Sequence, residues 1–247
     1  MMKVNWPQAF AEIGLLVIGG VLALGGDAWM DYRRGLEAEH TYLVSLRDDF
    51  EETRQLTARY LDQNRRSLAI CLELLGVLSG PPDAMSPERV SGLIRDAFWV
   101  YTLEPVRATY LDMVSSGDLE LLRSTELRVD LAQAEEDLQR LETFGDLQWR
   151  HWMQLELEFL RQHHDLGLVY PGYVGDAQSL DLEIEPLHFP AAGFGPDMNE
   201  LRSRDFRNIV VARSIVYQDA IVYGTAALRR FEGIFELLDG ELGRFQR

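Results

Sequence analysis

The strongest constraint on this chain is an uncharged apolar run close to its N-terminus, Ile13 to Gly26, with the sequence IGLLVIGGVLALGG. No other stretch of the 247 residues stays apolar for so long without a charge. As a helix the run is about 21 Å long, at ~1.5 Å per residue, which is short for a hydrocarbon core of ~30 Å. By itself the run therefore leaves three interpretations open: a membrane anchor, a cleaved signal peptide or a buried core helix.

The aromatic residues on either side of this run favour the anchor. Trp6 precedes the run and Trp29 follows it. About 35 Å of helix separates them, which places aromatic rings at both interfaces of a bilayer. Glu12 then lies just inside one interface, where its carboxylate reaches the headgroups at moderate cost. A signal peptide needs a more basic start than Lys3 alone provides. We therefore predict a single-pass anchor over residues 1–30, in a bacterial inner (cytoplasmic) membrane.

Small residues within the run form one stripe on this predicted helix. Gly19, Ala23 and Gly26 are spaced by four and three residues, so a second helix can approach closely there. The stripe predicts self-association or docking to a membrane partner; the alternative is the ordinary tolerance of membrane helices for glycine. The orientation in the membrane stays undecided, because Lys3 before the run balances the arginine pair 33–34 after it, and the positive-inside rule needs a clear difference.

Charge and cysteine content narrow the possible partners. The chain carries 40 acidic against 24 basic residues, for a net charge of -16. Such a chain repels phosphate backbones, so we expect no nucleic-acid partner. Cys71 is the single cysteine, which excludes an intramolecular disulfide and a thiolate metal cluster within one chain. We expect Cys71 to be a small buried core residue.

The rest of the chain has the pattern of a helical bundle. Residues 31–78 contain no proline and repeat apolar residues at helical spacing, which predicts one long helix continuous with the anchor and ended by residues 79–82. Further helices are predicted over 87–101 after an N-cap at Ser86, over 105–116 before a C-cap at Gly117, over a single turn capped by Asp118, over 124–164 and over 198–245. This pattern predicts an all-α fold, with residues 31–247 as a soluble antiparallel bundle.

One long segment, residues 166–197, departs from the helical pattern. It is rich in proline and glycine, and it carries the aromatic residues Tyr170, Tyr173, Phe189 and Phe194. Loops of this length in compact domains are often functional. We therefore take these four aromatics as a candidate contact loop, while a purely structural cover over the bundle remains the alternative.

Two stretches carry a resemblance to a known group of proteins. They are Glu12 to Arg34, and Thr109 to Arg128 with the sequence TYLDMVSSGDLELLRSTELR. The signature-like positions of the second stretch are Thr109, Tyr110, Ser116, Gly117, Leu119, Leu127 and Arg128. The chain resembles an uncharacterised family of single-pass, membrane-anchored bacterial helical proteins. It departs from that family at residues 26–28, where an asparagine pair is replaced by Gly-Asp-Ala. The resemblance implies a membrane anchor and a helical domain, and it implies no activity.

The chain contains residues that can bind metal, but they do not have the arrangement that a metal site requires. A di-metal bundle site needs two Glu-x-x-His pairs on helices, but only Glu37 with His40 is helical, since Pro186 interrupts Glu185 with His188. The adjacent histidines at 163–164 point about 100° apart on a helix. We interpret them as protonated helix-end histidines, and we predict no metal and no cofactor.

Three functional hypotheses remain at this stage. The first is a membrane-anchored interaction protein without evident catalytic activity, whose partners are the lipid bilayer and another protein or a second copy. The second is a small-ligand binder or enzyme with a pocket between the bundle and the 166–197 loop. The third is a soluble protein with a buried N-terminal helix.

Overall fold

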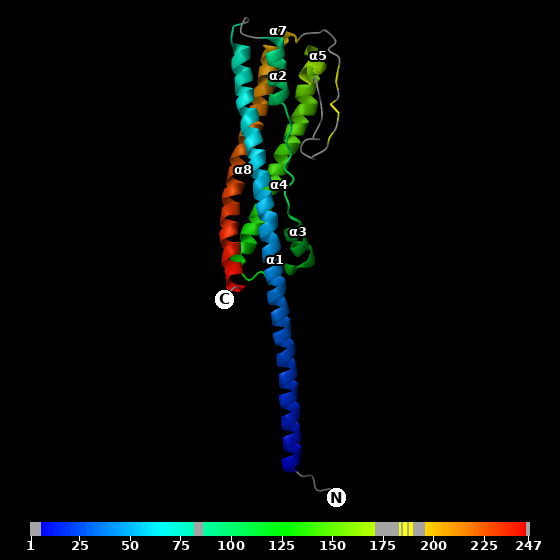
Figure 1. Ribbon diagram of the computed structural model, residues 1–247, viewed down its shortest axis with the longest axis vertical. Helices are drawn as coiled ribbons and strands as arrows, with labels where there is room; N and C mark the ends of the chain where they lie inside the picture. The colour runs from blue at the N-terminus through cyan, green and yellow to red at the C-terminus, as the bar shows by residue number, and fades with distance from the viewer. Residues whose placement is uncertain are drawn as a thin grey trace. The chain divides into compact units, whose positions relative to one another are not determined.

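The computed structural model describes residues 6–81, 86–170, 183, 185–186, 188–189 and 196–245 (Figure 1). For residues 6–25, 27 and 28 the description covers the backbone alone. The described part is helical and contains no strand, which confirms the predicted all-α class. Two compact units make up the chain; unit 1 comprises Met1–Asp49, Arg107–Val129 and Ile234–Arg247, and unit 2 comprises Phe50–Val106 and Asp130–Gly233.

Helix α1 is a single unbroken helix of 74 residues, Trp6–Ser79. It confirms the prediction that the N-terminal helix continues directly into the first bundle helix. Its end coincides with the predicted stop at residues 79–82. There the Ser79 hydroxyl donates to the Leu75 carbonyl, and the Gly80 N–H donates to the Val77 carbonyl. Where side chains are described, no helix combines the length and apolar character that crossing a bilayer requires. The predicted transmembrane segment falls almost entirely outside those residues and gains no support from them.

Unit 1 contains the first part of α1, two short helices and the adjoining ends of α4 and α8. Its short helices are α3, Ala108–Ser116, and the 3₁₀ turn η2, Asp118–Leu121. Helix α3 begins later than the predicted Pro105, where the Asp49 carboxylate of α1 accepts a 2.9 Å hydrogen bond from the Thr109 N–H. Gly117 ends α3 with φ +84°, a left-handed conformation that glycine adopts without strain.

Unit 2 gathers the C-terminal part of α1 and most of the remaining helices. They are α2 (Pro87–Ala97), α4 (Thr125–His151), the π-helical turn η3 (Trp152–Glu156), α5 (Leu157–His163), α6 (Leu166–Val169), α7 (Met198–Leu201) and α8 (Arg204–Phe245). The predicted helix over 124–164 is thus interrupted by a π-turn. The predicted helix over 198–245 breaks before Arg204, where the Ser203 hydroxyl accepts from the Phe206 N–H.

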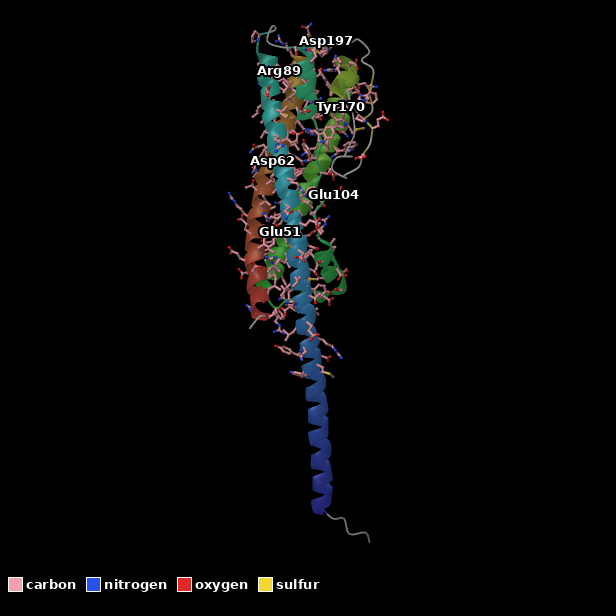
Figure 2. The ribbon with its side chains drawn as sticks, in the orientation of Figure 1. Glu51, Asp62, Arg89, Glu104, Tyr170 and Asp197 are labelled. Carbon is pink, nitrogen blue, oxygen red and sulfur yellow. The ribbon has the colours of Figure 1, made fainter. Side chains whose placement is uncertain are left out.

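The start and the end of α2 have different physical causes. Ser86 caps its start as predicted, by accepting from the Arg89 N–H at 3.2 Å. The Arg89 side chain also reaches Glu73 on α1 at 2.9 Å (Figure 2). The predicted end near residue 101 is wrong, because α2 stops at Ala97. Side chains of α8 bond to the carbonyls beyond that point and hold the chain in a non-helical path.

The core of unit 2 joins the helices at one end of this unit, where α2 runs beside the C-terminal part of α1 and the start of α8 (Figure 1). Its buried members are Cys71, Leu74, Leu78, Val90, Ile94, Ala97, Phe98, Leu160, Val169, Leu201, Phe206, Val210 and Tyr217. Further along, α1 and α8 approach closely at Gly224. A Cβ added there would lie 2.5 Å from a methyl carbon of Leu61.

Candidate functional site

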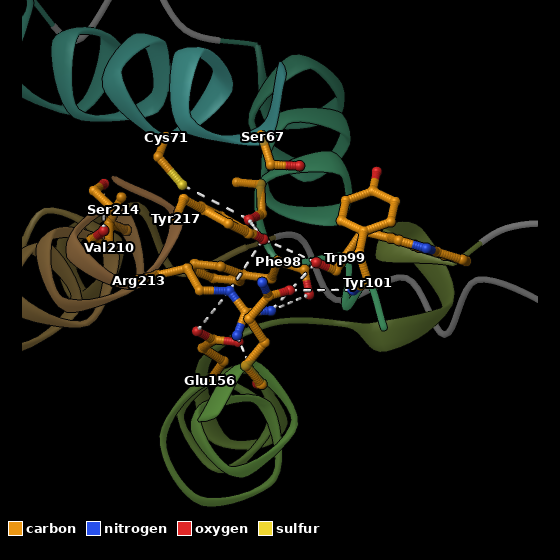
Figure 3. A network of polar contacts seen from close by, with 12 residues as sticks. Ser67, Cys71, Phe98, Trp99, Tyr101, Glu156, Val210, Arg213, Ser214 and Tyr217 are labelled. Atoms are coloured by element: carbon orange, nitrogen blue, oxygen red, sulfur yellow. Dashed lines mark hydrogen bonds and ion pairs between the residues drawn. The ribbon is translucent and has the colours of Figure 1, made fainter. Parts of the chain in front are cut away.

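A buried polar network inside unit 2 centres on Arg213 of α8 (Figure 3). The Arg213 side chain has an exposed fraction of 0%. Its guanidinium donates to the carbonyls of Gln148 (2.6 Å), Phe98 (3.0 Å) and Trp99 (3.3 Å), and to the Tyr217 hydroxyl (3.1 Å). Arginine supplies five fixed donors, which explains how one side chain holds both α4 and the segment after α2.

Tyr217 lies one turn after Arg213 on the same helix and completes this arrangement. Its hydroxyl is 2.8 Å from both the Ala97 and the Trp99 carbonyl oxygens. The guanidinium carbon of Arg213 also lies over the Tyr217 ring, 5.1 Å from its centroid. Burial raises the pKa of Tyr217, so the phenol stays protonated and acts as a donor. Together the two side chains bind the carbonyls of Ala97, Phe98 and Trp99, at the end of α2 and just beyond it, and so hold the chain where the helix stops.

Glu156 reaches the network from the π-helical turn η3. Its Oε1 lies 3.6 Å from Arg213 Nε, and both side chains have exposed fractions of 0%. Within the described residues, neither carboxylate oxygen of Glu156 has a hydrogen-bond partner. Burial raises the pKa of Glu156 to about 8, while the charge of Arg213 acts in the opposite direction. The group can therefore exchange a proton near neutral pH, and π-turns are frequent at functional positions.

A second row of hydrogen bonds extends from this centre to α1. The Gln148 side chain accepts from the Tyr101 N–H at 3.1 Å and donates to Asn64 Oδ1 at 2.9 Å. The Asn64 amide in turn donates to the Tyr60 carbonyl at 2.7 Å. These contacts tie the segment after α2 to both α1 and α4 of unit 2.

Cys71 is buried beside the network, as the sequence predicts. Its Sγ lies 3.7 Å from the Ala97 carbonyl oxygen. Burial raises the pKa of the thiol to about 12, so it is not a reactive thiolate at neutral pH.

The signature-like residues of Thr109–Arg128 shape unit 1. Three groups on α1 hold this segment: Asp49 accepts from the Thr109 N–H, Tyr42 donates to Asp118 at 2.8 Å, and Glu39 accepts from the Arg123 N–H at 2.9 Å. The predicted capping role of Asp118 is wrong, because Gly117 occupies the cap position and the Asp118 carboxylate accepts from Tyr42 instead.

The other signature positions serve the same local turn. The Ser116 hydroxyl accepts from the Asp118 N–H, and Arg128 donates to the Leu122 carbonyl at 2.8 Å. Leu127 is fully buried, while Tyr110 and Leu119 are half-buried. In unit 1 these residues thus pack the segment against α1.

The predicted anchor and contact-loop residues are only partly described. The side chains of Trp6, Glu12, Gly19 and Ala23 lie outside the described residues, as do Tyr173 and Phe194. Gly26 is exposed, with open space around it. Trp29 is 60% exposed and Arg33 lies over its ring. Tyr170 packs edge-on against Trp152, with ring centroids 5.9 Å apart, and Phe189 is exposed.

The histidines at the end of α5 have separate surroundings. His163 packs against the Phe159 ring, whereas His164 is buried and its Nε2 lies 3.0 Å from the Ser91 hydroxyl. Burial lowers the pKa of His164, which favours the neutral ring over the protonated form expected from the sequence. Across the residues that the structure describes, no three His, Cys, Asp or Glu side chains are grouped to hold a metal ion.

Sequence reasoning missed Arg213, Glu156 and Gln148. One signal was available, because Arg213 interrupts the apolar stretch IVVARSIVY of residues 209–217. A lone arginine in such a stretch is either exposed on the helix or buried with partners, and only the fold shows which.

The chain matches no family model, no curated protein and no solved structure. The resemblance of Glu12–Arg34 and Thr109–Arg128 to the anchored bacterial family therefore stays a prediction from sequence.

Proposed function

We propose that this chain is a single-pass, membrane-anchored interaction protein of a bacterial inner membrane, acting as a sensor, scaffold or accessory subunit. The observation that carries the proposal is the continuity of α1. One unbroken helix contains the apolar run at 13–26 and also supplies core residues to each unit, such as Leu43 to unit 1 and Leu74 to unit 2. A displacement of the anchor is thereby carried along the helix backbone into the bundle.

The residues that follow the apolar run support an interfacial position. Trp29, Met30 and Tyr32 are all exposed large side chains on α1. The Arg33 guanidinium lies 5.4 Å from the centroid of the Trp29 ring. Exposed aromatic rings with basic neighbours are typical of the membrane–water interface.

The network around Arg213 supports a structural role within unit 2. Its arginine, tyrosine and glutamine groups bond mostly to main-chain carbonyls and amides. Such bonds fix the path of the chain after α2, as expected for a rigid scaffold. The second candidate function, small-ligand binding, has one observation in its favour, namely the two carboxylate oxygens of Glu156 without hydrogen bonds.

The proposal is tested by isolating the full chain from membranes after brief cross-linking in cells, with the attached species identified by mass spectrometry. We expect a defined protein partner or a second copy. A variant with Gly19→Leu and Ala23→Leu distinguishes contacts made through the anchor from contacts made through the bundle, because it weakens only the contacts of the anchor. Recovery of the chain alone, with a bound small molecule, would replace the interaction role by the ligand-binding one.

A further inference from the structure

A serine and a histidine meet inside unit 2, between α2 and the residue that follows α5. Ser91 Oγ lies 3.0 Å from His164 Nε2. Ser91 is 3% exposed and His164 is 8% exposed, so both side chains bond within the protein and not to bulk water. This pair is separate from the network around Arg213.

The two side chains form a row with two main-chain carbonyls. His164 Nδ1 lies 3.0 Å from the Asp165 carbonyl oxygen, and Ser91 Oγ lies 2.8 Å from the Pro87 carbonyl oxygen. A carbonyl can only accept, so the three contacts of the complete row need three hydrogens. The hydroxyl and a neutral imidazole supply two hydrogens, whereas the hydroxyl and an imidazolium supply three. The row is therefore complete only when the ring is protonated.

We propose that Ser91 and His164 form a proton switch. At neutral pH the His164 Nδ1–H donates to the Asp165 carbonyl, and the Ser91 hydroxyl donates to Nε2. In mild acid a proton from water binds Nε2, the new N–H donates to Ser91 Oγ, and the hydroxyl hydrogen turns to the Pro87 carbonyl. The bond between α2 and the end of α5 is thus kept while its direction reverses. The inference rests on the proposed function and deepens it, because it names acidification as a signal for the sensor role.

Asp165 provides the negative charge that acts on the ring. Burial lowers the pKa of His164, whereas the carbonyl and the carboxylate of Asp165 act in the opposite direction. That carboxylate also accepts from the Gly167 N–H at 2.8 Å, and at the start of α7 the Asp197 carboxylate caps its own helix. The ring is therefore neutral near pH 7 and takes up its proton below its ordinary pKa of 6.5.

The charged side chains of α2 near Ser91 have other surroundings. Glu88 is exposed to solvent. Arg89 donates to Glu73 of α1 at 2.9 Å, and Arg95 donates to its neighbour Asp96 at 2.8 Å. These ion pairs balance the arginine charges, so from α2 the ring meets a neutral hydroxyl that can serve as donor or as acceptor.

Nuclear magnetic resonance of the full chain in mild detergent, with ¹⁵N only in its five histidines, tests the switch. The variant His164→Gln identifies the signals of residue 164 by their loss. Near pH 7 we expect a hydrogen on Nδ1 and none on Nε2, because the Asp165 carbonyl can only accept. On acidification Nε2 should gain a hydrogen while the chain stays folded. A hydrogen on Nε2 near pH 7, or no proton uptake before the chain unfolds, would overturn the proposal.

Ser91→Ala tests the part played by the hydroxyl. It should weaken proton binding at His164 about tenfold, because a buried charged N–H then lacks its acceptor. Ser79→Ala removes a hydroxyl that bonds in the same way to a carbonyl of its own helix, and should leave the titration of His164 unchanged. An unchanged titration in Ser91→Ala would also overturn the proposal. The measurements on the unaltered chain decide the matter if that variant fails to fold. Failure of the switch leaves the interaction role intact, since cross-linking and membrane extraction test that role separately.

Discussion

Glu156 Oε1 and Arg213 Nε lie 3.6 Å apart, and water reaches neither side chain. The arginine directs its hydrogen bonds to main-chain carbonyls and to Tyr217, so Glu156 faces the guanidinium without a hydrogen bond. The guanidinium therefore holds the main chain just beyond α2, while Glu156 supplies a buried acid that compensates the charge of Arg213 once its proton is lost, near pH 8. These two tasks can be separated by mutation.

Replacing Arg213 by Met should destabilise the chain by roughly 3–5 kcal/mol, because buried main-chain carbonyls lose their donor and the Glu156 carboxyl loses the neighbouring positive charge. Adding Glu156→Leu should recover only part of this loss. The carbonyls of Phe98 and Gln148 still lack their donor, at a cost of about 1–3 kcal/mol each. Urea unfolding of Arg213→Met, Glu156→Leu and the double variant measures the coupling free energy between the two side chains. Strictly additive losses in the free energy of unfolding would contradict that coupling.

The carboxyl of Glu156 should make stability depend on pH. Its pKa is raised to about 8 in the folded chain from an ordinary value of 4.5, so the folded state holds a proton that the unfolded state releases. This contribution is complete below pH 4.5, falls as pH rises and is lost above pH 8, with a total of roughly 3–5 kcal/mol.

Glu156→Gln should remove that slope. The comparison of both proteins by chemical unfolding between pH 5 and pH 9 isolates the group, since His164 and the other titrating residues are shared. Parallel curves for the two proteins would show that Glu156 does not hold the proton.

Gly224 should be intolerant of a side chain. A Cβ at this position meets Leu61 at 2.5 Å, so Gly224→Ala should cost about 1–3 kcal/mol through overpacking. Gly233 lies in the same helix with nothing within 4 Å, and Gly233→Ala should instead stabilise by about 0.5–1 kcal/mol. Thermal unfolding of the two variants should thus give shifts of opposite sign. Shifts of the same sign would rule out a steric cause.

Asp49 should control the start of α3 in unit 1. Asp49→Ala removes the acceptor for the Thr109 N–H and should cost about 1 kcal/mol, as other capping losses do. Hydrogen exchange should accelerate in Ala108–Ser116. Asp48→Ala, at the exposed neighbouring position, is the matched control and should leave the exchange rates as they are.

Sequence reasoning recovered the features that depend on local chemistry. The end of α1 at Ser79, the Ser86 cap and the Gly117 stop all follow from residues within one turn. It failed where distant side chains decide the outcome. Helix α2 is shortened by Arg213 and Tyr217, more than 110 residues further along the chain. The exposure of Ile215 and Val222 was also invisible, since their pattern alone predicts core residues.

The central claim is that the apolar run at residues 13–26 holds the chain in a membrane, and carbonate extraction of cell membranes tests it most directly. The full chain should stay in the membrane pellet at alkaline pH. A variant with Val17→Arg and Leu22→Arg should move to the supernatant, because arginine at the centre of a span costs about 2.5–3.5 kcal/mol per residue. Release of the unaltered chain by carbonate would contradict the account and favour a soluble protein.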